Sequence, residues 1–272
     1  MINSQLHITS LNIPALEPFR TLRRPIDHLR QGIFVAESEK VSLRLLESPI
    51  EPISILLSSD WFERYRTVIE HHSLPINVYI GEKSLIETIV GHRLHQSIMV
   101  LARVPKQITM EELLAHKNRH CLYVMVDGIT NAENMGVIVR NCASFQVDAL
   151  IVLPTSCDPY LRRSVRNSMG NIFKLPIVYV NDTMRDIQRM KEEGIALYAA
   201  FLSTKSKDIR NFTFKNASCI ILGAEGNGIT PDIVSLSDEW IQIPMKKGVD
   251  SLNVASASAV LLYEASQQLH RK

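Results

Sequence analysis

Short apolar runs in the second half of the chain constrain the fold more than any other feature of this sequence. The runs are rich in valine, isoleucine and leucine, and helical or turn-forming segments bound each of them; they are CLYVMVD (121–127), ALIVLP (149–154), IFKLPIVYV (172–180), IALYAAFL (195–202), CIILGAE (219–225) and WIQIPM (240–245). Strands that are apolar along their whole length are buried on both faces. The second half therefore predicts an α/β domain with a mostly parallel sheet, closed by a helix over residues 251–272.

The first half shows a looser form of the same alternation. Its strand-like runs are GIFVAE (32–37), ISILLSS (53–59), INVYIG (76–81) and SIMVLARV (97–104). Polar helical patterns separate them, which predicts a smaller α/β domain over residues 1–104. The next stretch, PKQITMEELLAHKNRH, opens with proline and is polar. It predicts a linker over residues 105–119, followed by the second domain over residues 120–272.

Composition narrows the class of protein. A chain of 272 residues with 46% hydrophobic and 21% charged residues is typical of a soluble protein of one large or two ordinary domains. The net charge of +2 means that any nucleic-acid surface must be a local basic cluster. Neither a secretory signal nor an apolar run of membrane-spanning length is present, so a reducing cytoplasm is expected. Scattered cysteines, never spaced as CxxC, are expected to be reduced thiols; they are Cys121, Cys142, Cys157 and Cys219.

The residues that follow the predicted strands indicate where a ligand binds, because parallel sheets place their sites at the carboxyl ends of strands. No GxGxxG follows Asp127-Gly128, and no GxxxxGK[ST] loop occurs. Three other stretches carry polar residues or glycines at such ends: Asn134, Gly136 and Arg140; Gly223, Glu225, Gly226 and Gly228; and Ser251 with Asn253. Taken singly each is weak, since glycines form ordinary turns and Ser251 is suited to capping a helix.

The three stretches together resemble a known family. In chain order, NAENMGVIVRNCASF (131–145), ILGAEGNGIT (221–230) and IPMKKGVDSLNVASASAVLLYEA (243–265) are similar to the three motifs of the SpoU/TrmH family of RNA 2′-O-ribose methyltransferases, in the SPOUT superfamily. The resemblance covers roughly residues 121–268. It implies a trefoil-knotted α/β domain, an exception to the rule that chains do not thread their own loops. It also implies S-adenosylmethionine as cofactor and a homodimer with an active site completed at the subunit interface.

The resemblance further assigns residues to roles. Those implied to bind S-adenosylmethionine are Leu222, Gly223, Gly226, Ile243, Met245 and Leu252. Arg140 is implied to engage the ribose 2′-hydroxyl, and Asn134 to position Arg140 or the ribose. Glu225, Ser251 and Asn253 are implied to brace the loop and the arginine.

Periodicity alone gives Arg140 a different role. Ile138, Cys142 and Phe145 share one face of a predicted helix, and Arg140 lies opposite, which is typical of a solvated charge. The resemblance reverses that interpretation. Because an arginine side chain keeps its proton in proteins, Arg140 is a poor general base. We therefore expect it to orient the hydroxyl and the adjacent phosphate through its planar fork, with deprotonation late or shared with phosphate.

An RNA substrate is implied by the first half and by basic clusters. Residues 15–48 resemble the RNA-binding domain, similar to kink-turn-binding ribosomal proteins, that precedes the catalytic domain in many relatives. This resemblance favours ribosomal RNA, with transfer RNA as the alternative. The candidate RNA-binding residues are Arg20, Arg23, Arg24, Arg162, Arg163 and Arg166, with Lys246-Lys247 as a further basic pair.

Several positions depart from the family pattern. Ser38 and Gln146 stand where relatives commonly have glycine, Asn131-Ala132 replaces a frequent Asp-Pro, and Asn171 replaces a commoner alanine. His92 and His95 favour a surface helix pair over a metal site, and no metal is expected.

Two other functional classes stay open. One is a non-catalytic RNA-binding protein that retains the fold. The other is a small-molecule enzyme with a nucleotide-like ligand, which the lack of a dinucleotide fingerprint and of a phosphate loop disfavours.

Overall fold

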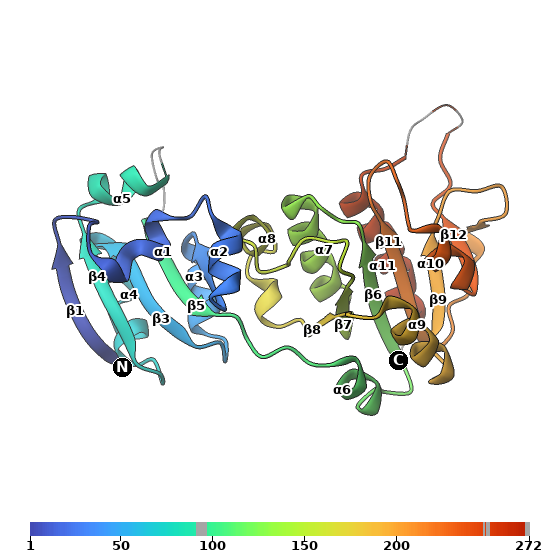
Figure 1. The fold of residues 1–272 in the computed structure, drawn as a ribbon, viewed down its shortest axis with the longest axis horizontal. Helices are drawn as coiled ribbons and strands as arrows, with labels where there is room; N and C mark the ends of the chain where they lie inside the picture. Colours follow the sequence, from blue (N-terminus) through green and yellow to red (C-terminus); the bar gives the residue numbers. More distant parts are fainter. Residues whose placement is uncertain (91–96, 247, 249–250, 270–272) are drawn as a thin grey trace. The chain divides into compact units, whose positions relative to one another are not determined.

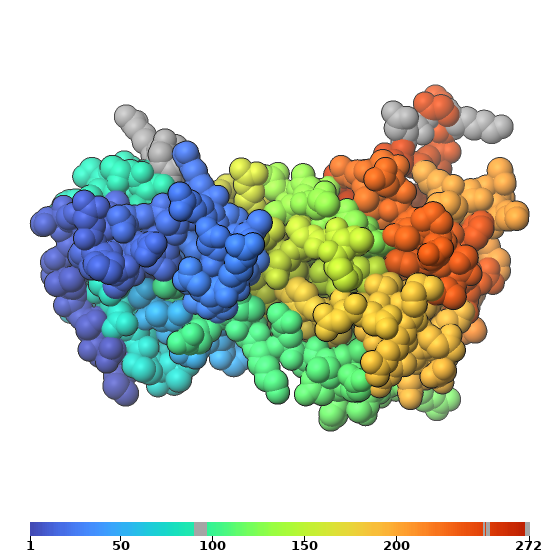
Figure 2. All heavy atoms as spheres, viewed as in Figure 1, coloured from blue at the N-terminus to red at the C-terminus, as the bar shows by residue number. Residues whose placement is uncertain are grey.

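The computed structural model describes residues 1–90, 97–246, 248 and 251–269. The chain forms two compact units (Figure 1). The first comprises Met1–Lys106 together with Tyr160–Phe173, and the second comprises Gln107–Pro159 together with Lys174–Lys272. Side chains fill the space between the elements within each unit (Figure 2).

A five-stranded sheet with the order β1-β4-β3-β5-β2 forms the centre of the first unit. The strands are β1 (Ile2–Ile8), β2 (Ile33–Glu37), β3 (Pro52–Ser58), β4 (Ile76–Gly81) and β5 (Ile98–Arg103). The helices are η1 (Pro14–Leu16, 3₁₀), α1 (Glu17–Arg20), α2 (Pro25–Arg30), α3 (Glu39–Leu46), α4 (Ser59–Glu70), α5 (Lys83–Val90), α8 (Arg162–Asn167) and η2 (Asn171–Phe173, 3₁₀). Strands β1, β4 and β3 are parallel, whereas β5 is antiparallel to both β3 and β2.

The strands predicted in the first half form as β2 to β5, but β1 was not predicted. Its sequence, INSQLHI, exposes five consecutive residues and buries only Ile8. An edge strand of this kind gives neither an apolar run nor a clear alternation. It forms because β4 offers it a parallel partner.

The buried carboxylate of Glu37, at the end of β2, holds α8 in the first unit. Arg162 Nε donates to Glu37 Oε2 at 2.7 Å, and Arg166 Nη1 donates to Oε1 at 3.0 Å. From α3, Arg44 Nη1 donates to the carbonyl oxygen of Met169 at 2.6 Å. These contacts explain why residues 160–173 pack with the first unit although their sequence lies between two strands of the second.

Both positions where glycine is replaced have left-handed backbone. Ser38 has φ 81° and ψ 153°, a region that only glycine adopts without strain. Gln146 has φ 57° and follows the last turn of α7 (Ala132–Ser144). The amide of Val147 donates to the carbonyl oxygen of Cys142 at 2.9 Å, the bond that closes a helix end with glycine-like geometry. The substituted side chains are therefore accommodated at an energetic cost.

A seven-stranded sheet with the order β10-β12-β9-β11-β6-β7-β8 forms the second unit. The strands are β6 (Cys121–Asp127), β7 (Ala149–Val152), β8 (Ile177–Tyr179), β9 (Ala196–Ala200), β10 (Lys207–Asp208), β11 (Ala217–Gly223) and β12 (Glu239–Gln242). The helices are α6 (Met110–Ala115), α7, α9 (Thr183–Glu192), η3 (Ile209–Asn211, 3₁₀), α10 (Pro231–Leu236) and α11 (Val254–Leu269). Every pair of adjacent strands in this sheet is parallel, which confirms the predicted fold class.

Helices cover both faces of this sheet. Along β6, the side chains of Cys121, Tyr123 and Met125 pack into one core with α6, α9 and α10. The alternate residues of the strand are also buried, on the face where α7 and α11 lie side by side. Burial on both faces is the physical reason for the continuous apolar runs.

The predicted strand over residues 172–180 differs from the structure. The 3₁₀ turn η2 occupies its start, and β8 begins only after Pro176. Proline has no amide hydrogen for a sheet and restricts the residue before it. The apolar residues Ile172 and Phe173 are buried in the first unit instead.

The stretch over residues 105–119, predicted as a linker, contains α6. Thr109 caps this helix by accepting from the amide of Glu112, while the Glu112 carboxylate accepts from the amide of Thr109. Met110, Leu113 and Leu114 are buried in the core of the second unit. The second unit consequently begins at Gln107, because an amphipathic turn lies within the polar sequence.

No helix in the described part of the chain is long and apolar enough to cross a membrane.

Candidate functional site

The first and second motifs leave the sheet at adjacent points. Strands β6 and β11 are parallel neighbours, and their last residues, Asp127 and Gly223, are paired in register. The loops that follow both strands therefore emerge at the same edge. Helix α7 begins after β6 with Asn131 as its cap, whose side-chain oxygen accepts from the amides of Glu133 and Asn134 at 2.7 and 3.1 Å.

Three predicted site residues, one from each motif, form a hydrogen-bonded cluster. Asn134 Nδ2 donates to Glu225 Oε1 at 2.8 Å. Asn253 Nδ2 donates to Asn134 Oδ1 at 3.1 Å and also to Glu225 Oε1. The Glu225 carboxylate thus accepts from both amides and fixes the loop after β11 against the starts of α7 and α11. We call these three residues the Asn134–Glu225–Asn253 cluster.

Asn253 has a second role as the cap of α11. Its Oδ1 accepts from the amide of Ala255 at 2.8 Å. The side chain is therefore held from both ends, with its oxygen on the helix and its nitrogen on the cluster. Ser251, the residue that sequence suits to capping, is exposed and instead lines the cavity described next.

A cavity of about 320 Å³ lies beside this cluster. All of the residues predicted to bind cofactor line it: Leu222, Gly223, Gly226, Ile243, Met245 and Leu252. Glu225 and Ser251 also contribute to its walls. The structure thus brings the second and third motifs together around one cavity, which is large enough for a small-molecule ligand.

Gly223 permits the close passage of two backbone segments at this cavity. A Cβ atom placed on Gly223 would lie 2.4 Å from the carbonyl carbon of Gly228 and from the amide nitrogen of Ile229. Ala224 and Gly228 exchange two backbone hydrogen bonds, so the loop between them folds back on itself. Glycine is required at this position because any side chain would displace the loop.

Arg140 projects from the exposed face of α7, as periodicity predicts. Within the described residues, its guanidinium has no hydrogen-bond or ion-pair partner, and it does not line the cavity. The helix that carries it is nevertheless anchored. Asn141 Nδ2 donates to the carbonyl oxygen of Ala255 and to Ser258 Oγ, both at 2.9 Å. Arg140 therefore lies between two anchored residues of α7: Asn134, which is bonded to Asn253 just before α11, and Asn141, which is bonded to α11 itself.

Sequence reasoning missed Asp127 and one wall of the cavity. Asp127 is 2% exposed, and its carboxylate accepts from Thr155 Oγ1 and from the amide of Thr230, each at 2.7 Å. It links the ends of β6, β7 and the loop after β11, a role visible only once strand order is known.

The missed wall consists of residues 200–202 and Gln242. The only signal was the apolar run 195–202, which continues two residues beyond β9.

The predicted basic clusters differ in their surroundings. Arg20, Arg23 and Arg24 are exposed on α1 and in the turn before α2. Arg162 and Arg166 are paired with Glu37, and both Arg163 and Arg166 of the same helix are exposed. Lys246 is exposed, while Lys247, His92 and His95 lie outside the described residues. No group of three metal-ligating side chains occurs among the residues that the structure describes.

Comparisons with known proteins agree on one family. Residues 121–263 match the SpoU rRNA Methylase family. An uncharacterised tRNA/rRNA methyltransferase of Mycobacterium tuberculosis is 29% identical over 266 residues, which cover 94% of this chain and 90% of the relative. The 23S rRNA (guanosine-2′-O-)-methyltransferase RlmB of Vibrio vulnificus is 30% identical over 177 residues, which cover 64% and 71% respectively.

The fold also matches a solved structure over almost its whole length. The structure of an S-adenosylmethionine-bound rRNA methyltransferase from Sinorhizobium meliloti aligns with a TM-score of 0.83 and 22% identity. The alignment covers 97% of this chain and 98% of the other. At this identity the likeness concerns the fold.

Proposed function

Because the chain belongs to the SpoU rRNA Methylase family, as its motifs predicted, we propose that it methylates a ribose 2′-hydroxyl in RNA with S-adenosylmethionine. The observation that carries the proposal is the convergence of the three motifs. The Asn134–Glu225–Asn253 cluster joins them beside a cavity lined by every residue predicted to bind the cofactor. The preferred substrate class is ribosomal RNA, in keeping with the names of the family and of the Vibrio relative.

The chemistry of the cavity fits S-adenosylmethionine. Leu222, Ile243 and Leu252 offer apolar surface for an adenine ring, and glycines at 223, 226 and 228 bring backbone groups within reach of polar atoms. The Glu225 carboxylate supplies negative charge at the wall for a ligand that carries a sulfonium. When bound, this cofactor supplies an activated methyl group.

Arg140 is proposed to hold the RNA nucleotide rather than to remove its proton. Its guanidinium is exposed, unpaired within the described residues and therefore available to a phosphate and a ribose hydroxyl. The planar fork suits bidentate contact, and an arginine side chain, which keeps its proton in proteins, is unsuited to act as a general base. Holding the hydroxyl in line with the methyl group contributes by orientation, and the hydroxyl proton leaves late, toward a phosphate oxygen.

The reaction is tested by methyl transfer from labelled S-adenosylmethionine to total RNA, with separated ribosomal and transfer RNA as substrates. Incorporation into ribosomal RNA is expected. Incorporation into transfer RNA alone would change the substrate class. Incorporation into neither, with RNA still bound, would replace the proposal by the non-catalytic RNA-binding alternative.

The role of Arg140 is tested by Arg140→Ala and Arg140→Lys. Both are expected to bind S-adenosylmethionine like the wild type, because Arg140 does not line the cavity. Methyl transfer should fall by about 100-fold or more in Arg140→Ala, as when a transition-state donor is removed, and Lys should restore only part of it. Arg185→Ala, which removes an exposed arginine from α9, is the control. Near-normal turnover of Arg140→Ala would refute the role.

Arg20, Arg23, Arg24 and Arg163 are proposed to contact RNA phosphates. Arg162 and Arg166 are proposed to belong to the same RNA-binding surface, with their guanidinium groups oriented by the Glu37 carboxylate. Neutralising Arg23 and Arg24 should weaken RNA binding and reduce its salt dependence. The measured quantity is the slope of the logarithm of the binding constant against the logarithm of the salt concentration, and each lost phosphate contact lowers this slope by about one. An unchanged slope would contradict the assignment.

A trefoil knot and a homodimer with a shared active site stay predictions from the family resemblance, and a cytoplasmic location stays a prediction from the sequence features alone. The dimer is checked by sedimentation equilibrium at micromolar concentration. A monomer that is fully active at these concentrations would contradict the shared site.

A further inference from the structure

The segment 201–206, directly after β9, contributes to a wall of the cavity that none of the three motifs includes. Ala200, Phe201 and Leu202 line the cavity. Leu202 is 53% exposed, although large apolar side chains are normally covered. A ligand in the cavity would cover part of this surface, so the position of the segment matters for binding.

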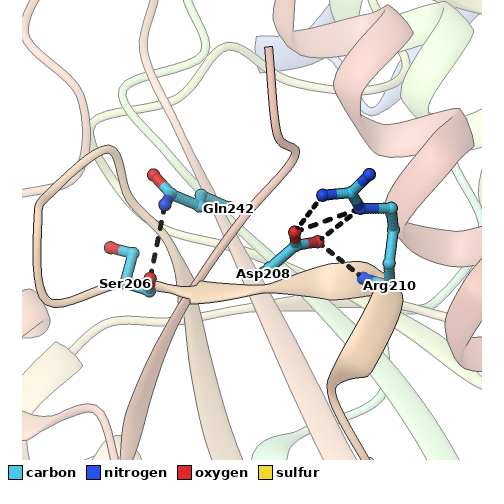
Figure 3. Close-up of polar contacts among 4 residues, drawn as sticks. All are labelled: Ser206, Asp208, Arg210 and Gln242. Carbon is cyan, nitrogen blue, oxygen red and sulfur yellow. Dashed lines mark hydrogen bonds and ion pairs between the residues drawn. The ribbon is translucent and has the colours of Figure 1, made fainter.

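This segment is attached to β12 at both of its ends. At its start, the amide of Phe201 donates to the carbonyl oxygen of Ile241 at 3.1 Å, and the Phe201 ring packs edge-on against Trp240 with centroids 5.4 Å apart. At its end, Gln242 Nε2 donates to the carbonyl oxygen of Ser206 at 3.3 Å (Figure 3). Leu202 lies between the two attachments.

The segment is also closed on itself. Ser206 Oγ donates to the carbonyl oxygen of Phe201 at 2.6 Å, and the amide of Ser206 donates to the carbonyl oxygen of Ser203 at 3.1 Å. A closed loop of this kind moves as one piece. Its far end is held to β12 in two ways: Lys207 and Asp208 of β10 pair with Ile241 and Gln242, and the Gln242 side chain bonds Ser206, the residue just before β10. The Gln242 bond is therefore the attachment that acts on the loop itself, on the side of Leu202.

We propose that Gln242 is a positioning residue for the cofactor: its side-chain amide holds segment 201–206 as a wall of the cavity. This inference rests on the proposed function. Gln242 itself lines the cavity, and donation by its nitrogen to Ser206 turns its oxygen away from that carbonyl, as Figure 3 shows. One side chain thus both contacts the wall segment and lines the ligand space.

Two substitutions of Gln242 test whether its side-chain nitrogen must donate a hydrogen bond to Ser206. Gln242→Met keeps the length and shape of the side chain but cannot donate, and Gln242→Glu replaces the donor with an acceptor. The affinity for S-adenosylmethionine, measured by calorimetry, should fall about three- to tenfold in Gln242→Met, the effect of one lost hydrogen bond, and further in Gln242→Glu. Gln242→Lys, which regains a donor, should recover part of the loss.

The kinetic signature separates positioning from catalysis. The KM for S-adenosylmethionine should rise by the same factor, while kcat at saturating cofactor stays within about twofold of wild type. Arg210→Ala is the matched control. It removes the side-chain pair with Asp208 on the same short stretch of chain, drawn beside Gln242 in Figure 3, and leaves the loop contacts intact.

The outcomes distinguish this inference from the proposed function. Wild-type protein that neither binds S-adenosylmethionine nor methylates RNA would refute the function itself. An active wild type with unchanged affinity in Gln242→Met would refute the role of Gln242 alone. An equal loss of affinity in Arg210→Ala would show that any disturbance of the β10–β12 edge weakens cofactor binding, and this would also refute the role of Gln242.

Discussion

Replacing Gln146 by glycine should stabilise the protein, although it removes a whole side chain. Gln146 follows the last turn of α7 with φ 57°. The left-handed conformation costs a residue with a Cβ atom about 1–2 kcal/mol, and glycine avoids that cost. Glycine in turn gives the unfolded chain more freedom, which costs about 0.5–1 kcal/mol. The difference predicts a net stabilisation of about 0.5–1 kcal/mol.

Thermal and urea unfolding measure this change. For a chain of this size, about 1 kcal/mol raises the melting temperature by about 2–4 °C, so Gln146→Gly should gain roughly 1–4 °C. The bond from the amide of Val147 to Cys142 should persist, because it involves only backbone atoms. Methyl transfer should be unchanged.

Gln188→Gly is the matched control for this substitution. Gln188 is an exposed residue inside α9, where glycine should cost about 1 kcal/mol. Opposite signs for the two variants are expected. A loss of stability in Gln146→Gly, similar to that of the control, would refute the argument from backbone conformation.

Substitutions at Ser38, Gly223 and Cys157 test three further local features of the structure. Ser38→Gly should raise the free energy of unfolding by about 1 kcal/mol in urea titrations, because φ 81° with ψ 153° is costly for serine, whereas Ser59→Gly in the first turn of α4 should lower it. Gly223→Ala should weaken S-adenosylmethionine binding about tenfold or more in calorimetry, because its Cβ would meet backbone atoms at 2.4 Å; wild-type affinity would contradict the required close approach. Burial, and secondarily the Asp158 carboxylate, raises the pKa of Cys157 to about 11. The pKa of this thiol in the folded protein thus exceeds its value of about 8.5 in the unfolded chain. The stability that the thiol contributes is therefore complete below about pH 8.5 and is lost as the pH rises through about 11. Between these two pH values the urea midpoint should fall more steeply in the wild type than in Cys157→Ser.

Most of the second half of the fold could be predicted because its central strands β6, β7, β9 and β11 are buried on both faces, so each appears in the sequence as an apolar run. The two-residue edge strand β10 has no such run and was not predicted. The first edge strand could not, since β1 exposes most of its side chains and depends on pairing with β4. The place of residues 160–173 depends on Glu37, a partner more than 120 positions away in sequence. No local pattern contains that information.

The same distinction holds for the site. The site residues in the three motifs were predicted from their resemblance to a family, and the structure places all of them except Arg140 around one cavity and one cluster. Asp127 and Gln242 were missed, because each acts through a backbone group of a distant segment, Thr230 and Ser206 respectively. Such contacts depend on strand order and loop path rather than on residue type.

The central claim is that the methyl group is transferred to a ribose 2′-oxygen. The most direct measurement is digestion of RNA methylated by this protein with labelled S-adenosylmethionine, followed by mass spectrometry of the nucleosides. We expect the label in a 2′-O-methylnucleoside, and we expect Arg140→Ala to bind the cofactor but to produce none. Label in a methylated base, or full transfer by Arg140→Ala, would contradict it.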